Sequence, residues 1–389
     1  MKTNCKIISK KEKRALWESF IKEDGSLVIP DNITEIPDYA LKDCTLLTTI
    51  TIGNSVKSIG KDAFSGCTSL IKVNYTGTID EWVQIEFGNE YANPLYYTES
   101  LYINNQLVIS ANITTATKIS NYAFYYCNLL MSVTIGNSVK SICEEAFARC
   151  GSLKSVTIGN NVKSIGNLAF YECRRLTNIK IGNNVRNIGS WAFYKCDSLT
   201  SVVVPDSVTS IDWGAFERCD ALTSITLPFI GAAKKRKSNT HFGYIFGASS
   251  YSCNDNYVPY SLGKVIITGD SSIGDYAFYK CNSLTSVEIP NNIKSIGSGV
   301  FYGCRCLQYN IKDGLKYLGN SKNKYLYLVG IKNISITTAN IDSKCRFISN
   351  SVFYNCSSLT NVVVPNNIIS IGLSVFERCS SLTSIVITR

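Results

Sequence analysis

The stretch "CDSLTSVVVPDSVTSIDWGAFERC" at 196–219 is one unit of a pattern that runs through most of the chain. It begins and ends on a cysteine. Leu199, Val202 and Val204 are its first apolar positions, Pro205 follows them, and Ala-Phe precedes the closing cysteine by three to four residues. Residues two apart share one face of an extended strand. Val202 and Val204 are therefore predicted to point into a core from a short strand.

The spacing of the cysteines reveals the period of the pattern. Successive gaps between the motif cysteines are 23, 60, 23, 23, 23, 23, 62, 23, 52 and 23 residues. Ten of the eleven have Phe three residues earlier, and all eleven have Leu three residues later. The unit is therefore 23 residues long, with three interruptions. The motif cysteines are Cys44, Cys67, Cys127, Cys150, Cys173, Cys196, Cys219, Cys281, Cys304, Cys356 and Cys379.

A unit of this size cannot bury its own apolar face, so neighbouring units must stack. The opening L-x-x-V-x-V is the strand signature of a leucine-rich repeat. We predict a mostly β solenoid of the α/β type, a right-handed leucine-rich repeat arc. Short parallel strands are expected on its concave side, and irregular, 3-10 or short helical segments on its convex side. The predicted core residues include Phe170, Cys173, Leu176, Phe193, Cys196, Leu199, Phe216 and Cys219.

The segment "SVTIGNNVKSIGNLAFYECRRLTNIKIG" (155–182) resembles the BspA-like leucine-rich repeat group, whose hallmark is a unit of about this length ending in A-F-x-x-C. The resemblance extends over nearly the whole chain from about residue 27, and the interruptions at 75–88 and 313–330 are similar to insertions in bacterial members. It implies a non-catalytic binding scaffold, an adhesin-like or antigen-like protein at a bacterial surface or secreted. Its expected partner is a protein or glycan on another surface.

The motif cysteines allow several interpretations. A zinc site needs clustered thiolates at spacings such as C-x2-C, often with His; that spacing is absent, and His241 is the one histidine. A regular array with its own core has little need of disulfides. We therefore predict buried thiols that pack as small hydrophobes, with no metal or cofactor. Cys173→Ser is expected to cost more stability than Cys173→Ala, because a buried hydroxyl needs a partner.

Little in the chain favours catalysis. The sequence has no G-x4-G-K-[ST] loop and no G-x-S-x-G motif. His241 and Cys253 lie in the same interruption, where a base and a nucleophile could meet, but incidental loop residues are the favoured interpretation. The prediction is that the protein is not an enzyme. A pair of carboxylates remains open as an alternative, since the chain has 29 acidic residues.

The ends are expected to differ from the array. Ser9 and Glu12 have capping-box spacing and Gly25 is a stop, which predicts a helix over 9–24. A cap on the first coil is favoured over a basic membrane or partner helix. The predicted domains are a helical cap at 1–26 and a single solenoid at 27–389, with insertions at about 76–106, 229–265 and 308–340.

The C-terminal "LTSIVITR" (382–389) is a strand start with nothing after it. An open edge there would indicate a trimmed chain, a missing downstream segment, or end-to-end association. No apolar run is long enough to span a membrane, and no signal peptide is visible. A cytoplasmic protein–protein interaction scaffold is therefore the alternative to a surface location.

The second interruption carries a basic cluster followed by aromatic residues. Cations beside aromatics can bind an anionic polymer or a protein patch. The favoured interpretation, however, is a solvated loop whose aromatics pack on the convex side, and binding is the alternative. A nucleic-acid partner is disfavoured, because the net charge of +10 is not confined to one stripe. The candidate binding residues are Lys234, Lys235, Arg236, Lys237, Phe242 and Tyr244.

The outward-pointing strand residues form the other candidate surface. They are mostly small and polar, and they lack the aromatic patch that an anchored hot spot needs. A polar ladder of this kind can bind a broad protein or glycan surface through many weak contacts. The residues are Ser155, Thr157, Asn178, Lys180, Ser201, Val203, Ser224, Thr226, Ser286, Glu288 and Val363.

Overall fold

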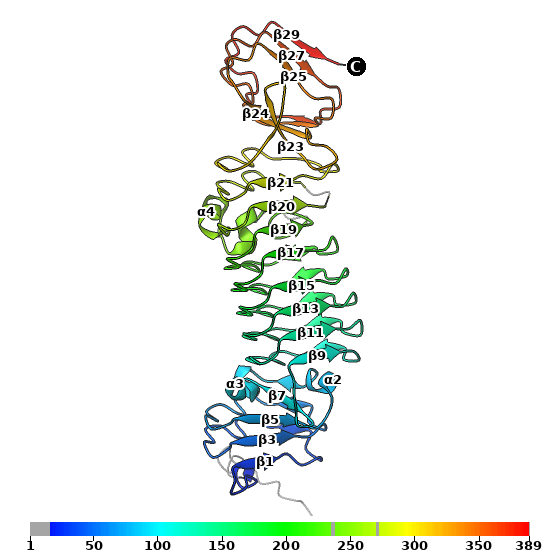
Figure 1. Cartoon of the computed structure of the whole chain (residues 1–389), viewed down its shortest axis with the longest axis vertical. Coiled ribbons are helices and arrows are strands. Elements are labelled where there is room, and N and C mark those ends of the chain that lie inside the picture. Colours follow the sequence, from blue (N-terminus) through cyan, green and yellow to red (C-terminus); the bar gives the residue numbers. More distant parts are fainter. Residues whose placement is uncertain (1–15, 235–237, 270–271, 389) are drawn as a thin grey trace, which may run out of the picture. The chain divides into compact units, whose positions relative to one another are not determined.

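The computed structural model describes residues 16–234, 238–269 and 272–388. Its elements are mostly short strands, with a few helices of one turn. The contacts divide the chain into two compact units. Unit 1 comprises 1–199 with 215–219, and unit 2 comprises 200–214 with 220–389. Each unit is a β-solenoid, as Figure 1 shows, so the predicted fold class is confirmed. The single solenoid domain at 27–389 stays a prediction.

The opening segment of each repeat forms the first strand of a coil. In unit 1 these strands pair in parallel with a shift of one repeat, so that Val133 lies beside Val156 and Val156 beside Ile179. Alternate residues are buried, as predicted from the pattern. The strands are β1 (Ser26–Val28), β3 (Thr49–Ile52), β5 (Lys72–Tyr75), β7 (Leu101–Ile103), β9 (Ser110–Ile113), β11 (Ser132–Ile135), β13 (Ser155–Ile158) and β15 (Asn178–Lys180). The short strand β8 (Gln106–Leu107) instead pairs antiparallel with β7.

A second parallel ladder runs along the same coils. Its strands are only two residues long, and Ile142 pairs with Ile119 on one side and Ile165 on the other. The sequence pattern does not distinguish so short a strand from a turn. In unit 1 the strands are β2 (Glu35–Ile36), β4 (Ser58–Ile59), β6 (Glu86–Phe87), β10 (Lys118–Ile119), β12 (Ser141–Ile142), β14 (Ser164–Ile165) and β16 (Asn187–Ile188).

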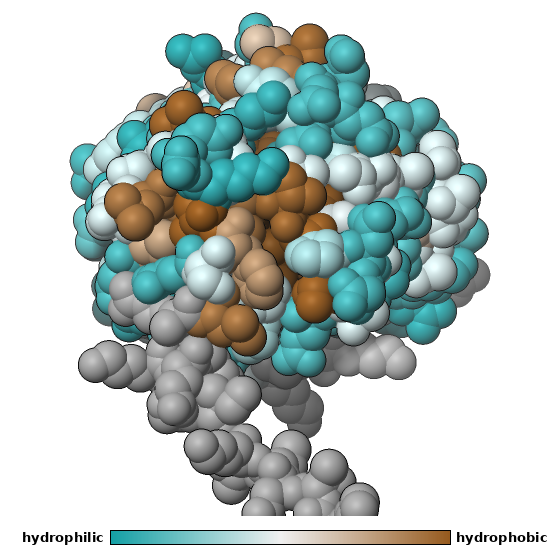
Figure 2. Space-filling view, turned by 90° about the horizontal axis from the view of Figure 1, so that it is seen from below, coloured by the Kyte–Doolittle hydropathy of each residue, from teal (hydrophilic) through white to brown (hydrophobic). Residues whose placement is uncertain are grey.

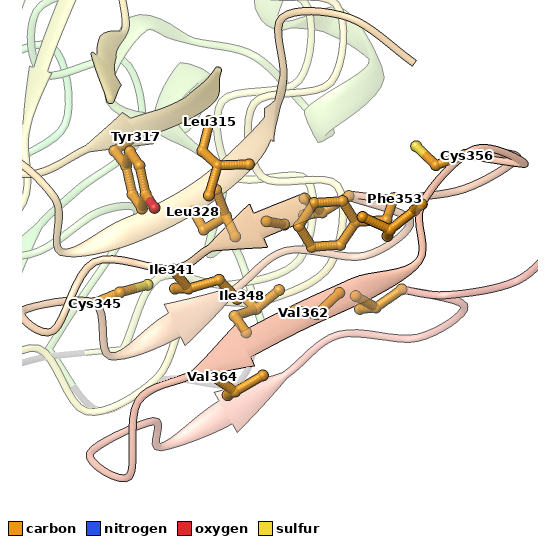
Figure 3. Close-up of a cluster of buried hydrophobic side chains, with 14 residues drawn as sticks. Leu315, Tyr317, Leu328, Ile341, Cys345, Ile348, Phe353, Cys356, Val362 and Val364 are labelled. Carbon is orange, nitrogen blue, oxygen red and sulfur yellow. The ribbon is translucent and has the colours of Figure 1, made fainter. Parts of the chain in front are cut away.

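Unit 2 repeats this arrangement and adds an antiparallel hairpin. β23 pairs antiparallel with both β22 and β24, while β24 continues into a parallel ladder with β26 and β28. Figure 3 shows the core on this side, where Tyr317 and Leu328 of the hairpin share one cluster with Phe353. The strands are β17 (Ser201–Val203), β18 (Ser210–Ile211), β19 (Ser224–Leu227), β20 (Lys264–Ile267), β21 (Ser286–Glu288), β22 (Asn310–Lys312), β23 (Leu315–Leu318), β24 (Tyr327–Ile331), β25 (Thr338–Asn340), β26 (Phe347–Ile348), β27 (Asn361–Val364), β28 (Ser370–Ile371) and β29 (Ser384–Ile387).

The A-F-x-x-C segment of each repeat forms a turn, here called the motif turn, rather than a helix. Every second backbone N–H of a motif turn donates to the next one. The N–H groups of Glu145, Phe147 and Arg149 donate to carbonyl oxygens one repeat further along, at 3.0, 2.8 and 2.6 Å. Glu145 and Arg149 have positive φ angles of 53° and 61°. The turn thus leaves donors along its edge, and the neighbouring turn accepts them.

The motif phenylalanines stack into a column behind the turns. The rings of Phe147, Phe170 and Phe193 follow one another at 5.2 and 5.4 Å between centroids, with interplanar angles of 1° and 2°. All eight predicted core residues are fully buried, from Phe170 through Cys219. Burying a side chain of this size contributes roughly 2–3 kcal/mol, so the repeat itself supplies the core.

The cysteines behave largely as predicted. All fifteen described cysteines are free thiols, and ten of the eleven motif cysteines are buried, with Cys379 of the last described motif turn partly exposed. Within a run of repeats, each thiol also donates to the carbonyl of the residue at the Phe position of the preceding motif turn. Cys173 Sγ lies 3.2 Å from Phe147 O, and Cys67 Sγ lies 3.0 Å from Leu41 O. Burial raises the pKa of the Cys127 thiol to about 12, so it stays protonated. The donated bond gives a serine hydroxyl a partner at Cys173, so the penalty for an unpaired buried hydroxyl need not apply there. The relative cost of Cys173→Ser and Cys173→Ala stays a prediction.

The first interruption forms three short helices. α2 (Ile79–Trp82) is capped by Thr78, which exchanges hydrogen bonds with Glu81 and so forms a capping box. The 3-10 helix η1 (Glu90–Ala92) and α3 (Leu95–Thr98) follow. The second interruption holds η2 (Phe242–Phe246), η3 (Tyr251–Cys253) and α4 (Asn254–Tyr257).

The start of unit 1 departs from its predicted helix. Within 16–24 only residues 16–18 are helical, so the helix does not reach residue 24. Residues 1–15 lie outside the described residues, and the cap at 1–26 stays a prediction. Trp17 is buried, while Leu16, Phe20 and Leu46 are exposed by about half or more. Figure 2 views unit 1 from this end and shows hydrophobic residues gathered within a hydrophilic rim.

Candidate binding surfaces

The exposed side of the first-strand ladder of unit 1, here called the ladder face, presents its residues in rows. Strand register places Asn112, Thr134, Thr157 and Lys180 side by side, and all four are exposed. In Figure 1 these positions lie on β9, β11, β13 and β15, which follow one another in order. The row is fixed by backbone pairing, so its spacing does not depend on side-chain contacts.

A second row runs parallel to the first on the same strands. It consists of Ser110, Ser132, Ser155 and Asn178. Ser132 Oγ donates to Ser110 Oγ at 2.8 Å. Hydroxyls and amides of this kind both donate and accept hydrogen bonds. The two rows can therefore form hydrogen bonds with a polar partner at many points, whether the groups of the partner donate or accept.

Unit 2 has its own exposed strand face, which differs in composition. Val203 is 64% exposed on β17, whereas Thr226 and Glu288 are half-buried. Lys264 Nζ lies 2.8 Å from Glu288 Oε1. Val363 on β27 is also half-buried. An exposed ion pair of this type adds little stability.

The basic cluster of the second interruption is only partly described. Lys234 is half-buried, and its backbone N–H donates to Thr209 O at 3.2 Å. Lys235, Arg236 and Lys237 lie outside the described residues. Their role in binding stays a prediction.

The aromatic residues beside that cluster face inward rather than toward a ligand. Phe242 is fully buried, and its ring packs on Phe246 and Phe278 at 5.2 and 4.9 Å between centroids. We therefore correct the expectation that Phe242 offers a ring to a ligand. Tyr244 is half-buried, and its carbonyl accepts from the Gly214 N–H at 3.1 Å. An aromatic residue of the second interruption, Phe242, thus packs in the core against the motif phenylalanine Phe278.

The single histidine and its neighbouring cysteine differ in burial: His241 is buried, and Cys253 is half-buried. His241 is 6% exposed, and burial lowers the pKa of its imidazole, which favours the neutral form. The hydroxyls of Ser250 and Ser252 lower the pKa of the Cys253 thiol. Among the described residues there is no group of three His, Cys, Asp or Glu placed to hold a metal ion. Nor is any described helix long and apolar enough to cross a membrane.

One carboxylate cluster was missed by the sequence reasoning. Burial and then the nearby Glu90 and Glu144 raise the pKa of Glu145 to about 7. Glu90 belongs to the first interruption, so the cluster joins residues from different repeats. No signal in the sequence links residues at this separation, because the interruption has no periodic copy elsewhere in the chain.

A scan for known families decides the assignment of the repeat. Residues 21–115, 117–235 and 271–389 match the family described as the BspA type leucine rich repeat region, in six copies. The chain belongs to the BspA-type leucine-rich repeat family. The motif turn and the cysteine column described above are thus the BspA-type repeat seen in three dimensions. Comparison with curated proteins finds no match.

Solved structures of bacterial leucine-rich repeat proteins are similar to the chain. A leucine-rich repeat protein from Bacteroides ovatus is 25% identical, with a TM-score of 0.51; the match covers 92% of this chain and 78% of that one. A leucine rich cell surface protein from Faecalibacterium prausnitzii is 24% identical, with a TM-score of 0.38, over 95% and 89% of the two chains. The first of these supports the leucine-rich repeat solenoid fold of the chain.

Proposed function

We propose that this BspA-type protein is a non-catalytic binding scaffold of the adhesin or antigen kind, at a bacterial surface or secreted. Its partner is a protein or glycan on another surface. The family assignment supports a repeat-protein binding scaffold. The surface location and the adhesive role go beyond that assignment and are part of the proposal.

The ladder face of unit 1 is the observation that carries the proposal. It holds two aligned rows of small polar side chains on a sheet whose register is set by backbone pairing. A preordered surface loses little conformational entropy when a partner binds. Many weak polar contacts over a wide area then suit an extended partner better than a small substrate.

The alternative is an intracellular protein–protein interaction scaffold that uses the same face. The two are separated by labelling intact cells of the native producer with an antibody against the chain. Surface signal before lysis supports the proposal, and signal only after lysis supports the alternative. End-to-end association through β29 also stays a prediction; Ile385 and Ile387 on that strand are 49% and 68% exposed.

The ladder face is tested by binding of the purified chain to immobilised extracellular-matrix glycoproteins and to a cytosolic protein extract. The variant Thr134→Lys with Thr157→Glu places two long side chains in the row without changing the net charge. The matched control is Asn183→Lys with Asn184→Glu, on exposed residues outside the strands. We expect the ladder variant to lose binding at least about tenfold, and the control to keep it. Equal binding by both variants would remove the ladder face from the proposal.

A further inference from the structure

A hollow of about 660 Å³ opens on the motif-turn side of unit 2, at the third interruption. Its volume lies within the range of roughly 300–1,000 Å³ typical of ligand sites. No residue that lines it is charged. Six tyrosines and Phe301 form much of the wall, and the rest is Gly, Val, Ser and Asn. The tyrosines used below are Tyr279, Tyr302, Tyr309 and Tyr327.

The hollow exists because one motif turn is missing. The coil after Phe301 supplies its inner strands, since Gly319 bridges to Glu288 and Tyr327 pairs with Phe347. Where an ordinary coil would continue into a motif turn, β24 turns back along β23 instead. The motif turns of Phe301 and Phe353 therefore have no third turn between them.

The wall formed by the first of these turns has open hydrogen-bond donors. In an ordinary repeat the three corresponding N–H groups each donate to the next motif turn. Among the residues that the structure describes, none accepts from the backbone N–H of Gly299, Phe301 or Gly303. Phe301 is also half-buried, whereas Phe278 and Phe353 are fully buried. Gly299 and Phe301 line the hollow directly.

The opposite wall has open acceptors. By the register of the repeat, the carbonyl oxygens of Asn350 and Val352 occupy the positions that receive N–H groups from a preceding turn. Within the described part of the chain, no backbone N–H donates to either of them. A partner that accepts along one edge and donates along the other fits both walls. Polypeptide backbone has this property, and peptides bind in this way when they add a strand to a sheet edge.

The aromatic walls favour a particular side chain in that peptide. Tyr279 and Tyr302 stack at 5.7 Å with an interplanar angle of 7°, continuing an outer column of tyrosines. Tyr302 is 67% exposed, so one side of that column ends in the open. In an uninterrupted run, Tyr171 and Tyr194 occupy the same positions and stack at 4.8 Å. An incoming aromatic ring would extend the column over Tyr302.

Cations at the rim add a preference for a flanking acidic residue. Lys280 Nζ lies 5.3 Å from the ring centre of Tyr279, and Lys316 Nζ lies 5.8 Å from that of Tyr309. Both tyrosines line the hollow. A carboxylate next to the inserted aromatic ring would therefore meet positive charge, as Glu172 meets Lys195 at 3.2 Å between ordinary motif turns.

We propose that this hollow is a docking site for a peptide segment of a partner protein, which takes the place of the missing motif turn. The segment carries an aromatic residue that stacks on Tyr302 and an acidic residue beside it. Its main chain accepts from Gly299 and Phe301 and donates to Asn350 and Val352. This inference is independent of the proposed function, because the ladder face belongs to unit 1 and the hollow lies wholly in unit 2.

The probe is a fluorescent peptide, acetyl-GNLAFYES-amide, which copies residues 166–173 with serine in place of Cys173. Titration of the full chain, followed by fluorescence anisotropy, should show saturable binding. A peptide with alanine in place of its tyrosine should bind about 5- to 10-fold more weakly, since it lacks the stacking ring. Maltohexaose is titrated in parallel as a neutral oligosaccharide.

Protein variants locate the binding. Tyr302→Ala removes the stacking surface and should weaken the peptide about 5- to 10-fold. Val329→Trp fills the hollow and should abolish binding; Val329 lines the hollow and is half-buried. Tyr194→Ala, at the equivalent position of an ordinary motif turn, is the matched control and should bind as wild type. Circular dichroism melting identifies any variant that fails to fold.

Three results would overturn the proposal. One is unchanged peptide affinity in a folded Tyr302→Ala or Val329→Trp variant. Another is equal affinity for the peptide with and without its tyrosine. The third is binding of maltohexaose with no binding of the peptide, which would make the hollow a glycan site. None of these results depends on the ladder face.

Discussion

The first and third interruptions present the same structural problem and fill it to different extents. Each follows a motif turn whose N–H donors have no ordinary motif turn beside them. In the first, the inserted residues take over all three: Asn89 Oδ1, Tyr91 O and Tyr97 Oη accept from the N–H groups of Asp62, Phe64 and Gly66, at 3.0, 3.1 and 2.6 Å. In the third, the corresponding donors stay open and a hollow remains.

The inserted residues of the first interruption also reach the coil that follows. Trp82 Nε1 donates to Ala123 O at 2.8 Å, and Asn93 Nδ2 donates to Tyr122 O at 2.7 Å. We call residues 79–98 the plug. Phe64 beside the plug is fully buried, whereas Phe301 beside the hollow is half-buried. The comparison teaches that a repeat can be interrupted without loss of core only when the insertion supplies both rings and acceptors.

Removal of the main plug side chain should have the largest effect. Trp82 is fully buried against Tyr75 and Phe87, with ring centroids 5.4 and 5.7 Å away. Trp82→Ala is expected to cost about 3–5 kcal/mol of unfolding free energy, measured by urea denaturation. Tyr302→Ala at the hollow is the counterpart and should cost less than about 1 kcal/mol. Similar costs at both sites would show that the plug is no better packed than the hollow.

The Phe column gives the next largest contrast. Phe170 has a stacked ring on each side, at 5.2 and 5.4 Å, whereas Phe301 has one stacked neighbour, Phe278, at 5.3 Å. We expect Phe170→Ala to lower the free energy of unfolding by about 3–5 kcal/mol. The loss for Phe301→Ala should be smaller by about 1–2 kcal/mol. Denaturant midpoints of the two variants, at unchanged m value, are the measurement. The reverse order would contradict the incomplete burial of Phe301.

The cysteines should respond to serine according to whether a carbonyl is within reach. Cys173 Sγ donates to Phe147 O, but Cys356, which follows the hollow, has Tyr354 O of its own turn at 4.0 Å. Cys356→Ser should therefore cost about 1–2 kcal/mol more than Cys173→Ser, since its hydroxyl would be buried without a good partner. Both alanine variants serve as references for lost volume. If Cys173→Ser and Cys356→Ser lost the same unfolding free energy, the hydrogen bond from Cys173 Sγ to Phe147 O would have no effect on stability.

The smallest predicted effect is a pH dependence at the plug. The pKa of Glu145 is raised above its ordinary value of 4.5 to about 7, first by burial and then by Glu90 and Glu144, with Arg149 opposing. The folded state binds this proton more tightly, so stability is present below pH 4.5 and is lost as the pH rises toward 7. Because the side chain is only about half-buried, the loss is about 1 kcal/mol.

Thermal midpoints of the wild type and Glu145→Gln between pH 4 and 8 test this. The amide mimics the protonated acid, so the thermal midpoint of the variant should rise relative to that of the wild type as the pH rises. A Glu99→Gln variant controls for the general effect of charge. A constant difference between wild type and Glu145→Gln across the range would rule out the titration.

Much of the fold followed from the repeat, and the reasons are local. The 23-residue spacing sets strand register directly, since Ser132 pairs with Ser155 one unit later. The capping box of Thr78 and Glu81 is local in the same sense, because such a cap needs only neighbours in sequence. Phe242 was misjudged, because a phenylalanine beside a basic run has the same local pattern whether it is exposed or completes a column.

The sequence by itself determined the repeat, its period, the inward residues and the cysteine column, because each is copied many times and stacking favours identical neighbours. Only the tertiary structure decided how the interruptions close. The plug joins Asn93 to Tyr122, and the hollow lies between turns that are 52 residues apart at Phe301 and Phe353. Such contacts depend on which backbone N–H groups remain unpaired once the coils are stacked, and stacking occurs only in the folded chain.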